Sequence, residues 1–502
     1  MTSRSRHLAW RRNWWLIAAL SSFTAGMLVL MGTEKVVPYT TSKSLAAQTK
    51  VDGAAKAKAI TEARGPQGHN VTNIVDMFDI GLVHTVEITM DPTEYDAMIT
   101  DYQRDGLKTW HSATVVIDGA RLDQVGLRLK GNSTLIGLRY SGPESPPNPG
   151  GLAAIFPRIT ADEPYKMPML LRFDQFLPGQ RYQSVNELAL RAGSLGDSTQ
   201  LTELLANLLT KESGQHYLRT STAGMSFNDS REGYFLLVEH PDDYWAQRMI
   251  PGRLEPAVYK AVPGASFHYV GDDLARYENV FNQQAETRSL GPAPMIEFLK
   301  FVETSTNEVF AAKLADRLDV KEFAQYLAFH NLIVDVDSFA GFGNNYYFLY
   351  DPKTRRMSIA PWDQNVAFGT LGGARYRPYY EDGAAIPSFA LDVDAIDELN
   401  DGGTGLGEEN ILMRRFFDTP KFRELYDETY RELFELLLRS GRADELALEL
   451  GAAIQDDAAA RNLVSPSAFD GAAAGKRAFI ASRIEYLVTH PIIAGEGGDK
   501  TR

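Results

Sequence analysis

The hydrophobic pattern of this 502-residue chain changes about halfway along, and the change restricts the folds open to it. In the first half, short segments alternate apolar and polar residues or are continuously apolar, which is typical of β-strands. In the second half, apolar residues recur at a spacing of three and four, as in helices that bury one face. Strands followed by helices predict an α+β fold with two lobes.

The strand-rich part also carries helix and turn signals. Asp91 and Pro92 supply an N-cap and a first helical residue, so we expect a helix over 91–102. The Asp-Gly dipeptide at 118–119 predicts a hairpin turn, and a loop or insertion is expected at 141–151, which contain seven Pro or Gly. The predicted strands are 84–90, 113–119, 125–131, 167–173 and 231–240, with a further helix at 201–214.

The helical part contains one predicted hairpin. The turn sequence DPKT separates two apolar segments, 345–350 and 356–360, which are expected to pair as strands. The predicted helices are 295–317, 321–334, 411–440, 444–463 and 477–488.

The N-terminus indicates a membrane anchor. An uncharged run of 18 residues at 14–31 follows a basic segment and is just long enough to span a bilayer. The run lacks a clear cleavage site, so an uncleaved signal anchor is favoured over a cleaved signal peptide. Because basic residues tend to stay in the cytoplasm, the rest of the chain is expected on the outer side of a bacterial membrane. The predicted organisation is a basic cytoplasmic segment, a transmembrane anchor, a flexible tether, an N-lobe, a C-lobe and a tail, at residues 1–13, 14–31, 32–72, 73–240, 241–490 and 491–502.

Composition excludes several chemistries. The chain has 51 Lys and Arg against 65 Asp and Glu, and the net charge of −14 argues against broad nucleic-acid binding. The absence of cysteine excludes disulfides, cysteine-bound zinc, iron–sulfur clusters and thiol catalysis. His240 and His330 are expected to be structural, because no histidine pair has zinc-site spacing.

The most informative segment is 330–369, in which a helix is followed by Asp337, the pair Asn344 and Asn345, the hairpin and then Asp363. Phosphoryl transfer needs a carboxylate that orients the acceptor and ligands for a divalent cation. Asp and Asn supply the oxygen ligands that Mg²⁺ prefers, and the hairpin can bring Asn345 close to Asp363. Single Asp and Asn residues in loops usually cap helices or form turns, but an ordered set is less easily explained that way.

With these residues the chain resembles the CotH kinase family, atypical protein-kinase-like enzymes named for a bacterial spore-coat protein. The resemblance covers about residues 73–465 and implies an α+β, bilobal protein-kinase-like fold with a strand-rich N-lobe and a helical C-lobe. It also implies transfer of the ATP γ-phosphate to Ser or Thr of protein substrates. The resembling segments are VGLRLKGNST (125–134), GYFLLVEH (233–240), VYKA (258–261), DVDSFAGFGNNYYFLYD (335–351), IAPWDQNVAFG (359–369) and NILMRRFFDTPKFRELYDETYRELF (410–434).

The resemblance implies a role for each residue of the core segment. Asp337 would be the base that orients the acceptor, and Asp335 is its nearest rival within the sequence DVD. Asn344 or Asn345, together with Asp363, would bind Mg²⁺. Pro-Trp-Asp stands where ordinary kinases have Asp-Phe-Gly, and Trp362 has no fixed equivalent in those kinases.

Nucleotide-binding candidates lie mainly in the strand-rich part. Lys130 is the candidate for the phosphate-contacting lysine, and Arg128 lies on the same strand face two residues away. Glu203 is either the partner of Lys130 or, as we favour, an exposed helix charge. Glu239 is a candidate for adenine contacts at the hinge, and Lys260 for phosphate or nucleotide contacts. The chain lacks the Gly-rich phosphate loop of ordinary kinases, so how a triphosphate is held stays open.

Two other functions remain possible. The chain could be a non-catalytic structural or adhesive surface protein, which would be favoured if Asp337 and Asp363 pointed apart or into salt bridges. It could also be a kinase-fold enzyme that transfers AMP or another group. ATP is scarce outside a bacterial membrane, which speaks against a kinase in that location. Residues 391–410 hold seven acids and no Lys or Arg, and they are expected to form a solvated loop that could prefer basic substrates.

Overall fold

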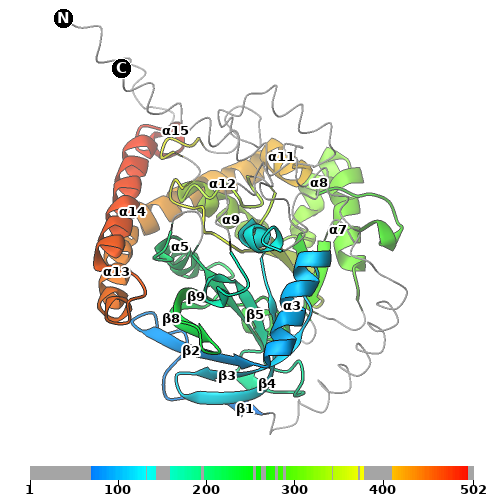
Figure 1. Cartoon of the computed structure of the whole chain (residues 1–502). Helices are drawn as coiled ribbons and strands as arrows, with labels where there is room; N and C mark the ends of the chain where they lie inside the picture. Colours follow the sequence, from blue (N-terminus) through cyan, green and yellow to red (C-terminus); the bar gives the residue numbers. More distant parts are fainter. Residues whose placement is uncertain are drawn as a thin grey trace, which may run out of the picture.

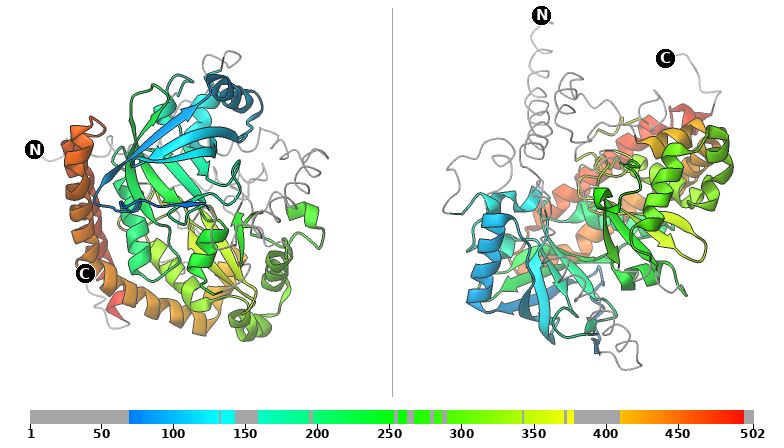
Figure 2. Two further views of the ribbon diagram at one scale, coloured as in Figure 1. Left: turned by 90° about the horizontal axis from the view of Figure 1, so that it is seen from below. Right: turned by 90° about the vertical axis from the view of Figure 1, so that its right-hand side faces the viewer.

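In the computed structural model of the chain, strands gather in the lower half of Figure 1 and helices cover them from above and from one side. Figure 2 shows the long helices near the C-terminus, in orange and red, along one flank of the strands. The structure describes residues 69–131, 133–142, 159–193, 197–252, 256–261, 267–277, 281–285, 290–341, 343–370, 373–377 and 410–495.

Seven strands form a closed barrel. Neighbouring strands are antiparallel except for β2 and β8, which pair in parallel and close the ring with Val83 opposite Thr222. In the order of pairing, the barrel strands are β2 (Val83–Met90), β3 (His111–Ile117), β4 (Ala120–Leu129), β5 (Met169–Arg172), β7 (Glu187–Ala192), β9 (Gly233–Glu239) and β8 (Thr220–Phe227). A short parallel pair, β1 (Asn70–Val71) and β6 (Arg181–Tyr182), lies beside the barrel.

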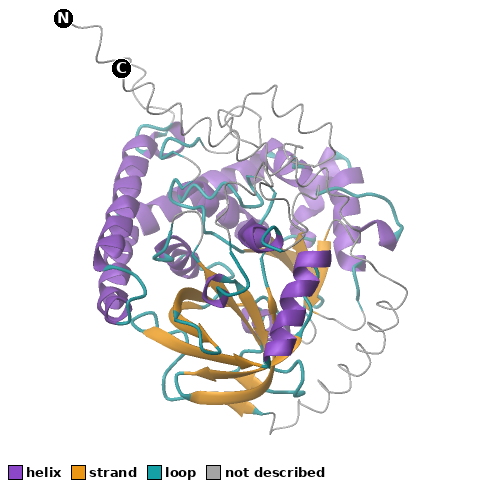
Figure 3. Ribbon diagram, in the orientation of Figure 1, coloured by secondary structure: helices purple, strands orange, loops and turns teal. Residues whose placement is uncertain are grey.

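The second sheet has four antiparallel strands in the order β11-β10-β12-β13, and it is framed by helices (Figure 3). These strands are β10 (Ala257–Ala261), β11 (Phe281–Ala285), β12 (Tyr346–Asp351) and β13 (Arg356–Pro361). The helices are α3 (Pro92–Asp105), α4 (Ile136–Arg139), α5 (Leu201–Glu212), α6 (Asp243–Met249), α7 (Ala293–Thr304), α8 (Asn307–Lys313), α9 (Val320–Leu332), α11 (Ile411–Asp418), α12 (Pro420–Leu433), α13 (Arg442–Ala460), α14 (Pro466–Leu487) and α15 (Pro491–Ala494).

The barrel wall is buried on both faces along β5, β7, β8 and β9, whereas β2 and β3 expose outward residues to solvent. Because side chains alternate along a strand, Leu127 and Leu237 fill the barrel interior, whereas their sequence neighbours point outward. Leu170 and Val238 point outward and belong to a second core, which continues into α9, α12 and the second sheet. The outer wall of the barrel and the helices therefore share one hydrophobic core.

The predicted bilobal protein-kinase-like fold is wrong. The strands close into a barrel instead of forming an open N-lobe, and the barrel wall shares a core with the helices. The prediction missed β7 and β8, and β8 is the strand that closes the ring. The predicted membrane anchor at 14–31, the segment before it and most of the tether lie outside the described residues. Among the helices of the described ranges, none has the length and apolar character needed to cross a membrane.

Several local predictions are confirmed. The carboxylate of Asp91 accepts a hydrogen bond from the Thr93 amide and caps α3. Asp118 and Gly119 both adopt positive φ at the turn between β3 and β4, and the β12–β13 hairpin forms as expected. Two predicted helices are divided, because Thr306 caps a new helix, α8, and Pro420 begins α12.

Truncation of a leucine that points into the barrel tests whether the barrel interior is packed. Leu237 is fully buried, so Leu237→Ala should lower the free energy of unfolding by about 2–5 kcal/mol through lost burial and a residual cavity. Leu448 on α13 is 53% exposed, and Leu448→Ala should change stability by less than about 0.5 kcal/mol. Urea unfolding measures both values. Equal, small changes would show that the barrel interior is not packed as described.

Candidate functional site

The loop between α9 and β12 holds the proposed acceptor-orienting carboxylate. Asp337 accepts hydrogen bonds from the side-chain amides of Asn344, at 3.0 Å, and Asn345, at 2.8 Å. Each amide donates to a different oxygen of the carboxylate, so the pair sets its orientation. Gly341 lets the loop fold back on itself, because a Cβ there would collide with the carbonyl oxygen of Val336. The structure thus brings together Asp337 and both asparagines predicted beside it.

Asp335, the rival candidate, has a different environment. Its carboxylate lies 2.9 Å from Nδ1 of His330, and both side chains are 1% exposed. This buried pair ties the start of the loop to the last turns of α9. Asp337 is therefore the better placed of the two to meet a substrate.

The β12–β13 hairpin brings Asp363 back to this loop. The amide of Trp362 donates to the carbonyl oxygen of Asn345 at 2.9 Å, which joins the two ends of the hairpin. Asn345 and Asp363 have φ values of 53° and 54°, and Val334 has 51°, a conformation that β-branched residues rarely adopt. Strained backbone of this kind clusters at functional sites, where the surrounding structure maintains it.

Asp363 forms an ion pair with Arg191, which points outward from β7. Arg191 also lies 2.9 Å from the carboxylate of Glu203 on α5, so one guanidinium links a barrel strand, a helix and the Asp363 segment. Glu203 is 2% exposed, which corrects its prediction as an exposed charge, and its partner is not Lys130. Burial, opposed by Arg191 and reinforced by Asp363 and Asp335, raises the pKa of Glu203.

Three predicted nucleotide-binding cations lie close by without carboxylate partners. Among the described residues, no carboxylate oxygen lies within 4.0 Å of a side-chain nitrogen of Arg128, Lys130 or Lys260. Lys130 and Lys260 lie over the ring of Trp362, 4.9 and 5.6 Å from its centroid, and Arg191 lies 5.6 Å from it. Lys130, Lys260 and Arg191 thus all lie over the indole of Trp362. We call Arg128, Lys130 and Lys260 the cation cluster.

Partial burial makes the positive charges of the two lysines of the cluster costly. It lowers the pKa of Lys130 well below its ordinary value, and the charges of Lys260 and Arg128 lower it further. Burial likewise lowers the pKa of Lys260 to about 8, although Asp363 opposes the shift. Nε2 of His240 lies 2.9 Å from Nζ of Lys130, and burial with the nearby lysine lowers the pKa of His240 to about 3. A buried cation without a counter-ion is stabilised when an anion binds beside it.

Glu239 lies away from this cluster. It forms ion pairs with Arg219, at 2.7 Å, and with Arg248, and its side chain is 4% exposed. On β9 it shares the face of Leu237, which points into the barrel, whereas Val238 between them points outward. The structure therefore places the Glu239 side chain on the opposite face of the strand from the cation cluster.

The carboxylates around Asp337 repel one another. Burial raises the pKa of Asp337 to about 7, and the charges of Asp335 and Asp363 contribute to the increase, although the asparagine hydrogen bonds oppose it. Within the described ranges, no group of three acidic or histidine side chains could hold a metal alone. Asp363 and an asparagine oxygen fit Mg²⁺ only if a ligand supplies further oxygens, as phosphates do. The donor set therefore fits a magnesium–phosphate complex better than a resident metal.

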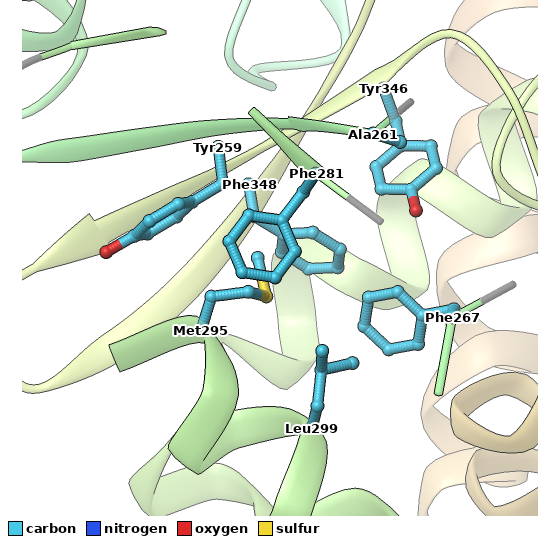
Figure 4. Close-up of a pocket in the computed structure, with 8 residues that line it drawn as sticks. All are labelled: Tyr259, Ala261, Phe267, Phe281, Met295, Leu299, Tyr346 and Phe348. Atoms are coloured by element: carbon cyan, nitrogen blue, oxygen red, sulfur yellow. The ribbon is translucent and has the colours of Figure 1, made fainter. Parts of the chain in front are cut away.

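An apolar pocket lies on the other face of the second sheet (Figure 4). Tyr259 and Phe348 line it from β10 and β12, with Met295 and Leu299 from α7. Since side chains alternate, Lys260 and its cross-strand partner Tyr347 lie on the opposite face of the sheet, where both approach the ring of Trp362. The pocket is therefore separated from the charged site by the sheet.

Sequence reasoning missed Arg191 and gave His240 no site role. Arg191 stands in the segment ELALRA, where one charge interrupts an apolar run. A charge in a buried strand requires a partner, and that was the only signal available from the sequence. His240 follows β9 and touches Lys130 through a contact between distant segments, which local patterns do not reveal.

Comparison with known families places the chain in a family. A family model described as CotH kinase protein matches residues 161–487, more than half of the chain. The match includes Asp337, Asp363 and Lys260, and it begins after β4, which contains Arg128 and is followed by Lys130. A comparison with curated protein sequences finds no match.

The raised pKa of Asp337 predicts a pH-dependent stability. In the folded chain the carboxyl group of Asp337 keeps its proton up to about pH 7, whereas the ordinary group loses it near pH 3.8. Between these values the protonated carboxyl favours the folded chain, so the free energy of unfolding falls as pH rises through this range. Asp337→Asn has no such loss, so wild type should become less stable relative to the variant between about pH 4 and 7. Urea unfolding in metal-free buffer measures the difference. Asp470→Asn, which changes an exposed residue of α14, is the control. A constant difference across this range would contradict the burial of Asp337.

Proposed function

The chain belongs to the CotH kinase family, and we propose that it transfers the γ-phosphate of ATP to a Ser or Thr hydroxyl of a protein substrate. One observation carries the proposal. A partly buried cation cluster without carboxylate partners lies beside Asp363, and Asp363 is joined through the hairpin to the asparagine-held Asp337. Phosphoryl transfer requires this combination of positive charge for phosphate and a carboxylate for the acceptor.

Asp337 is the proposed acceptor-orienting base. The two asparagines fix both oxygens of its carboxylate, so an acceptor hydroxyl would meet it in one orientation. In its ionised form Asp337 can accept the hydroxyl proton as the oxygen attacks phosphorus. Its pKa of about 7 is close to neutral pH, where a base can both exist ionised and hold a proton.

The cation cluster is proposed to hold the phosphates. Lys130 and Lys260 approach from a barrel strand end and from β10, so they would contact a polyphosphate from two sides. Their partial burial reduces screening by water and strengthens the attraction to an anion. Side-chain cations would thus replace the backbone amides of a Gly-rich loop, which this chain lacks.

Magnesium is proposed to bind between the carboxylates and the phosphates. Asp363 and an asparagine of the loop would hold it, and when bound it neutralises charge on the phosphate oxygens. In the structure Arg191 forms ion pairs with both Asp363 and Glu203. With magnesium bound, Arg191 would still link this segment to Glu203 and so hold it against α5.

The same ion pair favours a second candidate function. Because Asp363 is engaged by Arg191, the site could be a stable, non-catalytic ion-pair network in a structural or adhesive surface protein. The two candidates differ in whether Asp363 is available to a metal and whether ATP binds at all. The following experiments separate them.

Loss of either carboxylate should abolish transfer. With full-length protein, Mg²⁺, γ-labelled ATP and a general protein substrate, Asp337→Asn and Asp363→Asn should each reduce labelling by about 10²-fold or more. Asp470→Asn changes an exposed aspartate of α14 and should label normally. Equal labelling by wild type and Asp363→Asn would refute the role of Asp363.

Two further outcomes identify the alternatives. If the wild type neither labels any protein nor binds ATP, the non-catalytic function is supported and the kinase proposal fails. If label enters protein from α-labelled but not from γ-labelled ATP, the transferred group is AMP.

Removal of a cluster lysine should weaken nucleotide binding. Lys130→Met and Lys260→Met each delete one charge-assisted contact, so the Kd for ATP should rise about 10- to 100-fold. The exposed Lys353 lies in the β12–β13 turn, and Lys353→Met should leave the Kd unchanged. Isothermal calorimetry measures all three, and unchanged affinity in both cluster variants would show that phosphate binds elsewhere.

A further inference from the structure

A buried arginine on α14 joins the two segments that carry the site. Arg483 is completely buried, and within the described residues no carboxylate oxygen lies within 4.0 Å of its guanidinium. Its acceptors are neutral and come from three places in the fold: the C-terminus of α9, the segment that follows Asp363, and α12. They are the carbonyl oxygens of Asn331, Leu332, Ala374 and Tyr376, Oδ1 of Asn331 and the hydroxyl of Tyr430.

The contacts satisfy the whole guanidinium. Arginine has five N–H donors, and all three nitrogens of Arg483 have acceptors, at 3.3 Å for Leu332, 3.0 Å for Ala374 and 2.9 Å for the Asn331 carbonyl. The carbonyls of Asn331 and Leu332 lie at the C-terminal end of α9, where the helix dipole favours a positive charge. This arrangement compensates the charge without an acidic partner.

Asn331 extends the connection. Its Oδ1 accepts from Arg483 and from the Tyr430 hydroxyl, both at 2.8 Å, and its amide donates to the carbonyl of Arg377 at 2.8 Å. Arg483 and Asn331 together hold residues 374–377 against the end of α9. A further bond, from the Phe368 amide to the Ile333 carbonyl at 2.7 Å, ties the same two segments nearer the site.

We infer that Arg483 is a positioning residue that sets the separation of Asp337 and Asp363. The loop that carries Asp337 begins where α9 ends, and residues 374–377 follow Asp363 along the chain. A planar group that binds both segments fixes their relative position, which a flexible lysine with three donors cannot do as well. The catalytic part of this inference rests on the proposed phosphotransfer, whereas the positional part does not.

Arg415 provides a matched control. It lies on α11, is 6% exposed, and also has no carboxylate oxygen within 4.0 Å among the described residues. It donates to the carbonyls of Val302 and Ser305 and to side chains there, between α7 and α8. Its loss should therefore destabilise the fold in a similar way without touching the two site segments.

The test compares full-length Arg483→Met and Arg415→Met at a temperature at which both are folded. Hydrogen exchange should accelerate at 333–345 and 363–370 in the Arg483 variant only. The kcat of the Arg483 variant should fall about tenfold or more while KM for ATP changes little, because small misplacements of reacting groups cost rate. Arg483→Lys should recover part of both losses.

Each result has a defined meaning. If Arg483→Met does not fold, Tyr430→Phe removes only the hydroxyl shared with Arg483 and should show the same pattern more weakly. Equal exchange and equal kcat in the Arg483 and Arg415 variants would overturn the inference. If wild type transfers no phosphate, the exchange comparison alone decides the positional role, and the failure belongs to the proposed function.

Discussion

Along β5, β7, β8 and β9 the barrel wall is buried on both faces, and the rest of the structure depends on this constraint. Strand side chains alternate, so one set fills the interior and the other must pack against helices. The outward residues Leu170, Ala189 and Val238 of β5, β7 and β9 are apolar and extend the second core. Two outward arginines, Arg128 and Arg191, are partly removed from water by the packing around the barrel.

Removal from water determines the electrostatics of the site. Arg191 is compensated by Asp363 and Glu203, whereas Lys130 and Lys260 have no carboxylate within 4.0 Å among the described residues and lie over the face of Trp362. A π face attracts a cation more weakly than a carboxylate does when both are buried. The positive charge of the two lysines is thus only partly compensated, and a bound polyphosphate would complete the compensation. The positive φ at Asn345 and Asp363 is consistent with a backbone shaped for a function rather than for stability.

Elements with local signals could be predicted from the sequence. The cap of α3, the Asp118-Gly119 turn and the β12–β13 hairpin depend on residues adjacent in the chain. The barrel could not be predicted in this way, because its closure pairs β2 with β8, which lie more than a hundred residues apart. The sequence of β8, TSTAGMSF, also lacks a clear apolar alternation because both of its faces are buried.

The sequence by itself determined the family and the order of Asp337, the two asparagines, the hairpin and Asp363, because these features depend on residue type and short spacing. Only the tertiary structure decided which aspartate is engaged by His330 and which is held by asparagines. It also decided that Glu203 pairs with Arg191, that three cations converge on Trp362, and that Arg483 joins the two site segments. Each of these contacts connects residues distant in the chain, and the burial that gives them their strength exists only after the strands and helices have packed together.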